Sequence, residues 1–342
     1  MNKPRIAIDA MGGDHAPDEI VAGALLAAKE SPAALLTLYG DEARVRALLH
    51  GPGADRIAVV HSPEAVPMDQ HASQALRSAD RTSLGMAIGA IKAGEADAVV
   101  SAGNSGAFLA IALIKLRTIE GIARPAIATV LPAVSGWTVL LDSGANVDCR
   151  AEWLEQFGIM GSAYASAVLG IERPKVALLS IGEERTKGNS LVLEAAALLE
   201  RAPINFIGNI EGKDMFHKVA DVVVTDGFVG NVVLKTGEGL VAAMGEVIKD
   251  TLLRRNVMNL LGTALLAPSL RGLRRRFDYE TYGGAPLLGV RGNCIYTHGR
   301  VSRRGIRGAI LTAISEFEHD VVGRIGDMVT PHLTRETTVE SA

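Results

Sequence analysis

Residues 6–17 read IAIDAMGGDHAP, a short apolar run that ends at Asp9 and is followed by a glycine-rich turn. The run predicts a buried β-strand, and the turn with Pro17 predicts the start of a helix. Similar apolar runs, each followed by a stretch of helical period, cover residues 35–39, 57–60, 98–101, 127–131, 139–141, 176–180, 204–207 and 222–225. Strands that are apolar throughout are buried on both faces, as in parallel sheets covered by helices. The sequence therefore predicts an α/β fold, a three-layer α/β/α sandwich with a mostly parallel sheet.

The composition is that of a globular protein of 342 residues, with a hydrophobic fraction of 48% and a net charge of −3. No linker divides the chain, so we expect a single α/β catalytic domain over residues 1–342. The aromatic content of 4% and the slightly acidic charge argue against nucleic acid as a partner. Cys149 and Cys294 are too few for a disulfide framework, and no Cys or His spacing suggests a metal ligand set. We predict a cytoplasmic protein without a metal.

One segment has a different composition, because six arginines and no acidic residue occur between Thr251 and Phe277. The arginines are Arg254, Arg255, Arg271, Arg274, Arg275 and Arg276, and the apolar residues on one helical stripe are Leu253, Val257, Leu260, Leu261, Ala264 and Leu265. Pro268 can end this helix, and Ser269 can cap a second. We predict that residues 252–277 form a protruding, basic, amphipathic helical hairpin on the membrane surface, which makes the protein peripherally membrane-associated. A helix pair packed in a dimer is the alternative.

Polar, glycine-rich loops follow the predicted strands, where α/β proteins bind their ligands. Residues 101–107 (SAGNSGA) offer amides and hydroxyls that can surround a phosphate or an acyl oxygen. Residues 182–189 (GEERTKGN) present Arg185 and Lys187 at the start of a predicted helix, which makes this loop the strongest candidate for an anion site. A solvated charged loop is the alternative there. Residues 142–146 fit either a ligand loop or a plain Asp/Asn turn.

The same loops exclude several enzyme classes. Gly106 directly follows Ser105, so the G-x-S-x-G elbow of serine hydrolases is missing, and Thr186 precedes Lys187 where a P-loop NTPase needs glycine. The G-x-G-x-x-G pattern of nicotinamide-binding proteins is absent, and we predict no cofactor. No Ser/His/Asp or Cys/His set is present to form a covalent intermediate. These residues predict the transfer of a group to or from a bound anion and leave the substrate open.

Four longer strings give a more specific indication. Residues 8–17 (IDAMGGDHAP), 101–107 (SAGNSGA), 208–212 (GNIEG) and 225–231 (TDGFVGN) resemble, in this order, the motifs of the bacterial phosphate acyltransferase family, PlsX. The resemblance implies that acyl-acyl-carrier-protein and inorganic phosphate are converted into acyl phosphate and free carrier protein for phospholipid synthesis. It also implies a homodimer, a fold similar to phosphotransacetylases and isocitrate dehydrogenases, and a membrane glycerol-3-phosphate acyltransferase as a further partner.

Under this resemblance, three residues are expected to be catalytic: Lys187 binds phosphate, Asn189 lies beside it, and Asp226 holds Lys187 or a phosphate proton. The expected substrate-binding residues are Asp9, Gly12, Gly13, Asn104, Ser105, Asn146, Gly227 and Asn231. Of these, Asn104, Ser105 and the amides of Gly12 and Gly13 would face carbonyl or phosphate oxygens. Because phosphate is already a nucleophile and a thioester already has a good leaving group, the reaction needs no covalent enzyme intermediate.

Two other functions remain open at this stage. The chain could be a phosphotransacetylase-like enzyme that uses acyl-CoA, or a non-catalytic scaffold on the membrane surface. If the donor is the carrier protein, which is acidic throughout its family, it should dock on a basic surface. The candidates for that surface are Arg300, Arg303, Arg304 and Arg307, and a solvated turn is the alternative.

Overall fold

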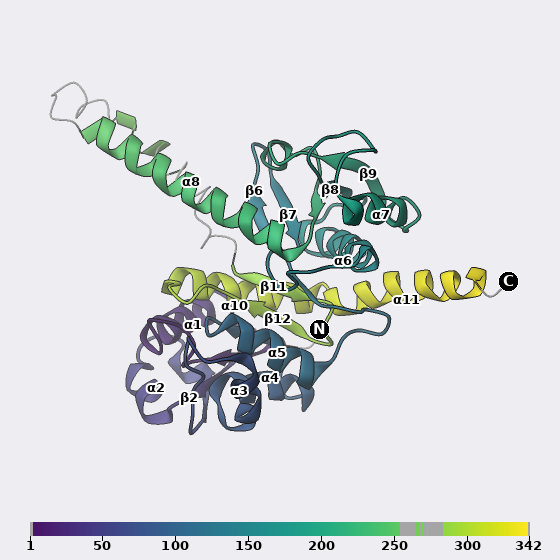
Figure 1. The fold of residues 1–342 in the computed structure, drawn as a ribbon. Coiled ribbons are helices and arrows are strands. Elements are labelled where there is room, and N and C mark those ends of the chain that lie inside the picture. Colours follow the sequence, from purple (N-terminus) through teal and green to yellow (C-terminus); the bar gives the residue numbers. More distant parts are fainter. Residues whose placement is uncertain (1–2, 254–264, 267, 270–271, 273–282, 341–342) are drawn as a thin grey trace.

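The computed structural model describes residues 3–253, 265–266, 268–269, 272 and 283–340, and its strands form two sheets with helices around them (Figure 1). The predicted α/β fold with mostly parallel strands and helical layers is confirmed. The division into two sheets was not part of the prediction, because the periodicity of a strand does not reveal which neighbour the strand will pair with.

The first sheet has seven strands in the order β3-β2-β1-β4-β12-β11-β5. They are β1 (Arg5–Asp9), β2 (Leu35–Gly40), β3 (Ile57–His61), β4 (Ala98–Ser101), β5 (Ala126–Ile127), β11 (Ala285–Leu288) and β12 (Asn293–Tyr296). Strand β11 runs antiparallel to both of its neighbours, and the other pairs are parallel. The carboxyl ends of β1 and β4, with the loops that follow them, therefore lie at one edge of this sheet.

Helices cover both faces of the first sheet. One face packs against α1 (Asp18–Glu30) and α10 (Arg303–Glu318), and the other against α4 (Ser83–Lys92) and α5 (Ser105–Leu116). Along β1, Ile6 and Ile8 belong to the first of these cores and Ala7 to the second, as the two-residue period of a strand requires. Shorter helices are α2 (Glu42–Leu48), α3 (Ala72–Arg77) and the 3-10 turns Ala54–Arg56, Ala79–Arg81 and Asp214–His217.

The second sheet has five strands in the order β6-β7-β10-β8-β9. They are β6 (Thr129–Pro132), β7 (Trp137–Leu141), β8 (Lys175–Leu179), β9 (Asn205–Ile210) and β10 (Val222–Val224), and only the β6–β7 pair is antiparallel. One face packs against α6 (Ala151–Leu169), α7 (Ser190–Leu199) and α11 (Val321–Glu340), and the other against the beginning of α8 (Gly227–Leu253). Helix α8 then projects away from both sheets (Figure 1).

The chain crosses between the sheets twice. The apolar run expected as one strand at 127–131 is split around Ala128, a buried residue whose amide donates to the carbonyl of Pro286 (2.8 Å), so that β5 and β6 lie in different sheets. After α8 the chain returns with β11 and β12, and β12 lies in the middle of the first sheet. These two strands were not predicted, because APLL contains a proline and NCIY begins with a polar residue, so neither resembles the runs of β-branched residues at β4 and β10.

Candidate functional site

Three neighbouring strands end at one edge of the second sheet. Strand β10 lies between β7 and β8 and is parallel to both, so the loops that follow these strands leave the sheet next to one another. The loops lead into α6, α8 and α7, and the N-terminus of a helix attracts anions through its dipole. Six of the predicted site residues lie in these loops or in the first turns of α7 and α8: Asn146, Lys187, Asn189, Asp226, Gly227 and Asn231.

Asp142 organises the loop after β7. Its carboxylate is fully buried, and Oδ1 accepts hydrogen bonds from the amides of Ile127 (3.0 Å), Gly144 (3.1 Å) and Ala145 (3.0 Å). Oδ2 accepts from the amide (2.7 Å) and the side chain (2.9 Å) of Asn146. Burial raises the pKa of Asp142, and these donors oppose the shift. The plain Asp/Asn turn considered for residues 142–146 is therefore present, and Asp142 is its centre.

The start of α8 packs directly on this turn. The amide of Gly227 donates to the carbonyl of Asn146 (2.8 Å), and a Cβ atom at Gly227 would lie 2.5 Å from that oxygen and 2.8 Å from Asp142 Oδ2, so no larger residue fits. Asn231 lies against Gly144 from the next turn of the helix. The structure thus brings Asn146, Gly227 and Asn231 together around Asp142. The amide group of Asn146 is itself occupied, because it also donates to the carbonyl of Pro125 (2.8 Å).

The loop after β8 carries Lys187 and Asn189. The amide of Lys187 donates to the carbonyl of Glu184 (3.0 Å), and Ser180 Oγ donates to the carbonyl of Lys187 (3.2 Å). Asn189 is the N-cap of α7, since its side chain accepts from the amide of Val192 (3.0 Å). The side chains of Lys187 and Asn189 are both exposed. The backbone of the loop is therefore fixed, while the ammonium group at its tip is available to a ligand.

Lys187 and Asp226 do not touch in this structure. The Asp226 carboxylate accepts from the amide of Val229 (2.9 Å), which makes it the cap of α8. Within the described part of the chain, no ion pair or hydrogen bond joins the ammonium of Lys187 to Asp226 or to another carboxylate. The two residues stand on neighbouring loops, and their joint action on phosphate remains a prediction.

Asp9 lies at the carboxyl edge of the first sheet, behind the turn at 10–13. It is fully buried and accepts from Ser83 Oγ (2.6 Å), Ser101 Oγ (2.8 Å) and the amide of Met11 (3.2 Å). Burial raises its pKa, and these hydrogen bonds oppose the shift. Gly12 packs on this carboxylate, because a Cβ there would lie 2.4 Å from Asp9 Oδ2, and Gly13 adopts φ +108° beside the carbonyl of Gly299. Asp9 therefore shapes the turn from inside rather than facing a ligand.

Asn104 and Ser105 form the beginning of α5. Asn104 caps the helix by accepting from the amide of Ala107 (2.9 Å), and its side chain donates to the carbonyls of Met68 (2.8 Å) and Gln70 (2.8 Å). Ser105 is exposed and hydrogen-bonds with the hydroxyl of Tyr296, whose pKa is raised by burial and lowered slightly by this contact. Asn104 is thus a structural link to the segment at 67–70, and Ser105 is the exposed polar group at this helix end.

Asp142 links the carboxyl edge of the second sheet to the first sheet. It accepts from the amide of Ile127 in β5, the last strand of the first sheet, and the amide of Ser143 donates back to the carbonyl of Ile127 (3.0 Å). Ala145 packs against a core of the first sheet. The loop after β7 therefore contacts both sheets.

The two thiols do not provide a nucleophile. Burial raises the pKa of Cys149 to about 12, and its Sγ donates to the carbonyl of Asn146 (3.5 Å). Cys294 is fully buried in β12, and burial raises its pKa as well. Because the thiolate is the reactive form, both groups are inert near neutral pH.

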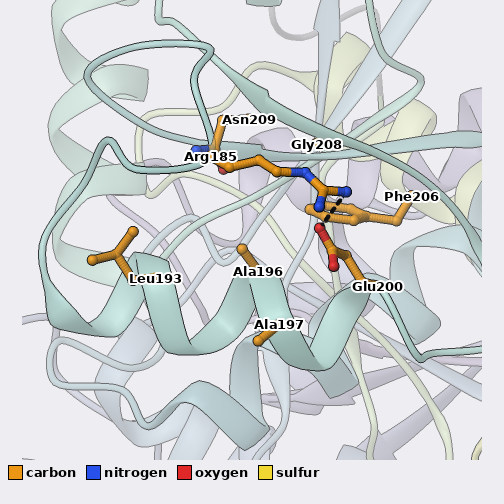
Figure 2. Close-up of a pocket in the computed structure, with 8 residues that line it drawn as sticks. All are labelled: Arg185, Leu193, Ala196, Ala197, Glu200, Phe206, Gly208 and Asn209. Atoms are coloured by element: carbon orange, nitrogen blue, oxygen red, sulfur yellow. Dashed lines mark ion pairs between the residues drawn. The ribbon is translucent and has the colours of Figure 1, made fainter.

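A pocket of about 160 Å³ lies behind the lysine loop, between that loop, α7 and β9 (Figure 2). Figure 2 shows Arg185 reaching from the loop to Glu200 at the end of α7, where the two form an ion pair (2.8 Å). Phe206, Gly208 and Asn209 line the pocket from β9. None of its lining residues belongs to the predicted site set.

The sequence analysis missed two residues that build the site, Asp142 and Asn209. Asp142 ends an apolar run, as Asp9 does, and the repetition of this position after two strands was the signal that could have identified it. Asn209 donates to the carbonyls of Glu184 (3.1 Å) and Lys187 (3.4 Å) from a different strand, a contact between distant parts of the chain that no local pattern predicts.

Most of the predicted hairpin at 252–277 lies outside the described residues. This applies to Arg254, Arg255, Val257, Leu260, Leu261, Arg271 and Arg274, and to the side chain of Leu253. Leu265 is described and is 82% exposed. Among the described residues, no helix has the length and apolar character needed to span a membrane.

The basic cluster after β12 is largely engaged in ion pairs. Arg303 forms a bidentate ion pair with Glu19 of α1. Arg307 forms an ion pair with Glu30, which also lies on α1. Arg300 lies 3.6 Å from the carboxylate of Asp14. These pairs reduce the positive charge that the cluster can offer to an acidic partner, so the proposed docking surface is weaker than its sequence indicates.

Comparisons with known proteins identify the relatives of this chain. A family model described as "Fatty acid synthesis protein" matches residues 4–324. The Phosphate acyltransferase of Pelotomaculum thermopropionicum is 49% identical over 316 residues, which cover 92% of each chain. That of Heliobacterium modesticaldum is 49% identical over 328 residues, 95% of this chain and 97% of the relative. The chain belongs to the phosphate acyltransferase family. It is an enzyme of the acyltransferase class, as the motifs indicated.

Solved structures support the fold. A phosphotransacetylase from Streptococcus pyogenes aligns with a TM-score of 0.64 at 17% identity, over 93% of this chain and 95% of that chain. The EutD phosphotransacetylase from Staphylococcus aureus aligns with a TM-score of 0.60 at 16% identity, over 92% and 94% of the two chains. The expected similarity to phosphotransacetylase folds is confirmed. The expected similarity to isocitrate dehydrogenases stays a prediction.

Proposed function

We propose that this phosphate acyltransferase family member takes its acyl group from the thioester of an acyl-acyl-carrier-protein. Inorganic phosphate is the acceptor, the products are acyl phosphate and free carrier protein, and the acyl phosphate serves phospholipid synthesis. The observation that carries the proposal is the exposed ammonium of Lys187 at the N-terminus of α7, beside the N-terminus of α8. An ammonium and two helix ends together attract an anion of the size and charge of phosphate.

In the proposed reaction, a phosphate oxygen attacks the carbonyl carbon of the thioester. A C–O bond forms, the carbonyl oxygen becomes an oxyanion, and collapse of this intermediate breaks the C–S bond. The thiolate that leaves takes up the proton that the phosphate carried, which gives free carrier thiol and acyl phosphate. Lys187 holds the attacking phosphate, and orientation of the two substrates can lower the barrier by roughly 7–11 kcal/mol. Amides at the helix ends stabilise the oxyanion, and each such donor is worth about 3–4 kcal/mol.

The remaining predicted residues act mainly by shaping this site. Asp142 holds the turn on which Gly227 packs, and Asp9 holds the turn that contains Gly12. Ser105 is exposed at the start of α5 and provides a hydroxyl on the side of the first sheet. We propose that the two sheets act as one catalytic unit, because the loop at 142–146 is bonded to both.

The proposed assembly is a homodimer associated with the membrane surface in the cytoplasm. Exposed apolar residues repeat along one side of α8 at Leu240, Met244 and Val247, with exposures of 60%, 54% and 65%. Such a stripe on a projecting helix is suited to a second copy of the chain. We further propose that the hairpin at 252–277 binds the membrane surface. A membrane glycerol-3-phosphate acyltransferase then consumes the acyl phosphate.

The donor is tested by offering acyl-acyl-carrier-protein and acyl-CoA of the same chain length to the purified enzyme at saturating phosphate. Release of the free thiol is measured for each donor. We expect a much higher kcat/KM for the carrier-protein thioester. A preference for acyl-CoA would overturn this choice of donor and favour the phosphotransacetylase-like alternative.

A further inference from the structure

Strand β9 contains a β-bulge beside the lysine loop. In its pairing with β8, Val176 is opposite Phe206 and Leu178 is opposite Asn209, so β9 has one more residue than β8 between these two pairs. Gly208 adopts φ +97° at this place, a backbone conformation that glycine allows most easily. Phe206 and Asn209 are three residues apart and would point to opposite faces in a regular strand, but the bulge places both on the side of the pocket in Figure 2.

The amide group of Asn209 is buried and has only one suitable orientation. Its Nδ2 donates to the carbonyls of Glu184 (3.1 Å) and Lys187 (3.4 Å), and the residue is 9% exposed. The opposite orientation would place Oδ1 against two carbonyl oxygens, neither of which can donate a hydrogen bond. Among the described residues Oδ1 has no hydrogen-bond partner. The two hydrogen bonds that Nδ2 donates are therefore the contacts that this buried amide group makes with the described residues.

These two bonds fix the part of the loop that carries Lys187. The amide of Lys187 donates to the carbonyl of Glu184 (3.0 Å), which closes a turn. Asn209 donates to the carbonyls of the first and last residues of that turn. Ser180 Oγ provides a second donor to the carbonyl of Lys187 (3.2 Å) from the end of β8. The lysine backbone is thus tied to two strands of the sheet.

We infer that Asn209 is a positioning residue for the acyl transfer reaction, which places the ammonium of Lys187 for phosphate through the backbone of residues 184–187. The inference rests on the proposed role of Lys187. The bulge at Gly208 lies next to Asn209, whose amide group donates to the loop, and bulges near active sites commonly redirect a side chain.

The test is a double-mutant cycle of Asn209→Ala and Lys187→Ala, with kcat and KM for phosphate measured in full-length protein. Loss of two ordinary hydrogen bonds predicts that Asn209→Ala lowers kcat/KM for phosphate by about 5- to 30-fold. In the Lys187→Ala background the same substitution should have almost no further effect, because the group that it positions is gone. Equal losses in both backgrounds would show a merely structural role and overturn the inference.

Two further variants separate positioning from folding. Asn205→Ala is the matched control, because Asn205 lies on the same strand and donates to the carbonyl of Arg173 (3.4 Å), away from the loop; it should keep the wild-type kinetics.

Asn209→Asp lacks the donor when ionised but can donate one O–H when protonated. Burial beside two carbonyl oxygens raises the pKa of this introduced carboxyl group above its ordinary value of about 4. The kcat/KM of this variant relative to Asn209→Ala should therefore rise as the pH falls from about 8 to about 5, and a constant ratio would overturn the inference.

The outcome for Lys187→Ala by itself decides the underlying proposal. If that variant keeps wild-type turnover and phosphate saturation, the proposed function of Lys187 fails, whatever Asn209 does. If Lys187→Ala is impaired and Asn209→Ala keeps the wild-type kcat/KM, the proposed function stands and the inference about Asn209 fails.

Discussion

At the scale of single residues, Lys187 combines a fixed backbone with an exposed side chain. The carbonyl and amide of the residue are hydrogen-bonded to Ser180, Asn209 and Glu184, whereas within the described residues no carboxylate pairs with its ammonium. A cation that the protein leaves without a partner at a helix N-terminus is available for a bound anion. The role of Lys187 can therefore be tested without disturbing an ion pair.

Replacement of Lys187 by Ala should slow acyl phosphate formation by roughly 10- to 150-fold, since a charge-assisted contact is worth about 1.5–3 kcal/mol. The measurement is the rate across a phosphate titration. Lys213→Ala is a suitable control, because Lys213 lies on the loop after β9 and pairs with Glu211 (2.8 Å). Normal phosphate saturation and normal turnover of Lys187→Ala would make Lys187 a solvated surface residue and move the site toward Ser105.

Asp226 has both a structural contact and a proposed chemical one. Asparagine caps helices as well as aspartate does, so Asp226→Asn should keep α8 and the thermal unfolding midpoint. If the negative charge holds Lys187 or a phosphate proton, the rate should fall by about tenfold or more. Asp226→Ala should lose the same rate and also about 1 kcal/mol of stability with the cap. A wild-type rate in Asp226→Asn would leave Asp226 as a helix cap only.

Glu316 predicts a dependence of stability on pH. This carboxyl group is buried in α10, and burial raises its pKa from 4.5 to about 8. The folded state therefore binds a proton more tightly than the unfolded state, so the stabilisation is complete below pH 4.5 and is lost as the pH rises toward about 8. Glu316→Gln cannot ionise, and its unfolding midpoint should fall less than that of wild type between about pH 4 and about pH 9, limits that enclose this window. Parallel pH profiles for the two proteins would contradict this assignment.

Some of the predicted site residues lie close together in the structure, and their roles stay predictions. Asn146, Gly227 and Asn231 were expected at one site and do lie around one turn. Asp9 was expected to face substrate and is instead enclosed by Ser83 and Ser101, because a serine far along the chain approaches it only in the folded sheet. A local sequence pattern cannot show that a side chain will be buried by segments distant in the chain.

At the scale of elements, the runs that became strands were mostly predicted, and their pairing was not. Strand β10 has three buried valines and was recognised, but nothing in those residues shows that it lies between β7 and β8. That position places the loops of Lys187 and Asp226 beside each other. Pairing between distant strands is decided by packing over the whole chain, so the site could be predicted as a set of loops and not as a geometry.

The predicted hairpin at 252–277 makes an element-scale prediction. Six arginines near an anionic lipid surface provide at most about 6 kcal/mol at roughly 1 kcal/mol each, so binding to vesicles should be reversible and weakened by salt. The double variant Leu261→Glu/Leu265→Glu should sediment less with acidic vesicles than the wild type. The reason is that the acidic side chains remove apolar contact and repel the lipid headgroups.

A matched control for this experiment is Ile114→Glu/Val134→Glu. Both residues are exposed, by 65% and 68%, and both lie outside the segment, so the change in charge and apolar content is the same. This variant should sediment like the wild type. Unchanged sedimentation of Leu261→Glu/Leu265→Glu would favour the alternative in which the segment packs in a dimer.

At the scale of the whole molecule, two helix-covered sheets meet at the loop that Asp142 organises. The chain enters the second sheet after β5 and returns to place β11 and β12 in the first. The first sheet is therefore assembled from two separate stretches of sequence, whereas the strands of the second all lie within residues 129–224. This arrangement brings the N-termini of α7 and α8 to one edge and that of α5 to the edge of the other sheet. The proposed reaction needs both substrates held at once, which suits a site with two sides.

The proposed reaction transfers an acyl group from a carrier-protein thioester to phosphate without a covalent enzyme intermediate. The most direct measurement is a product balance: free thiol and acyl phosphate are quantified together while purified full-length protein acts on acyl-acyl-carrier-protein at increasing phosphate. The account predicts one acyl phosphate for each thiol released and no thiol release without phosphate. Thiol release in the absence of phosphate, or free fatty acid as the main product, would contradict it.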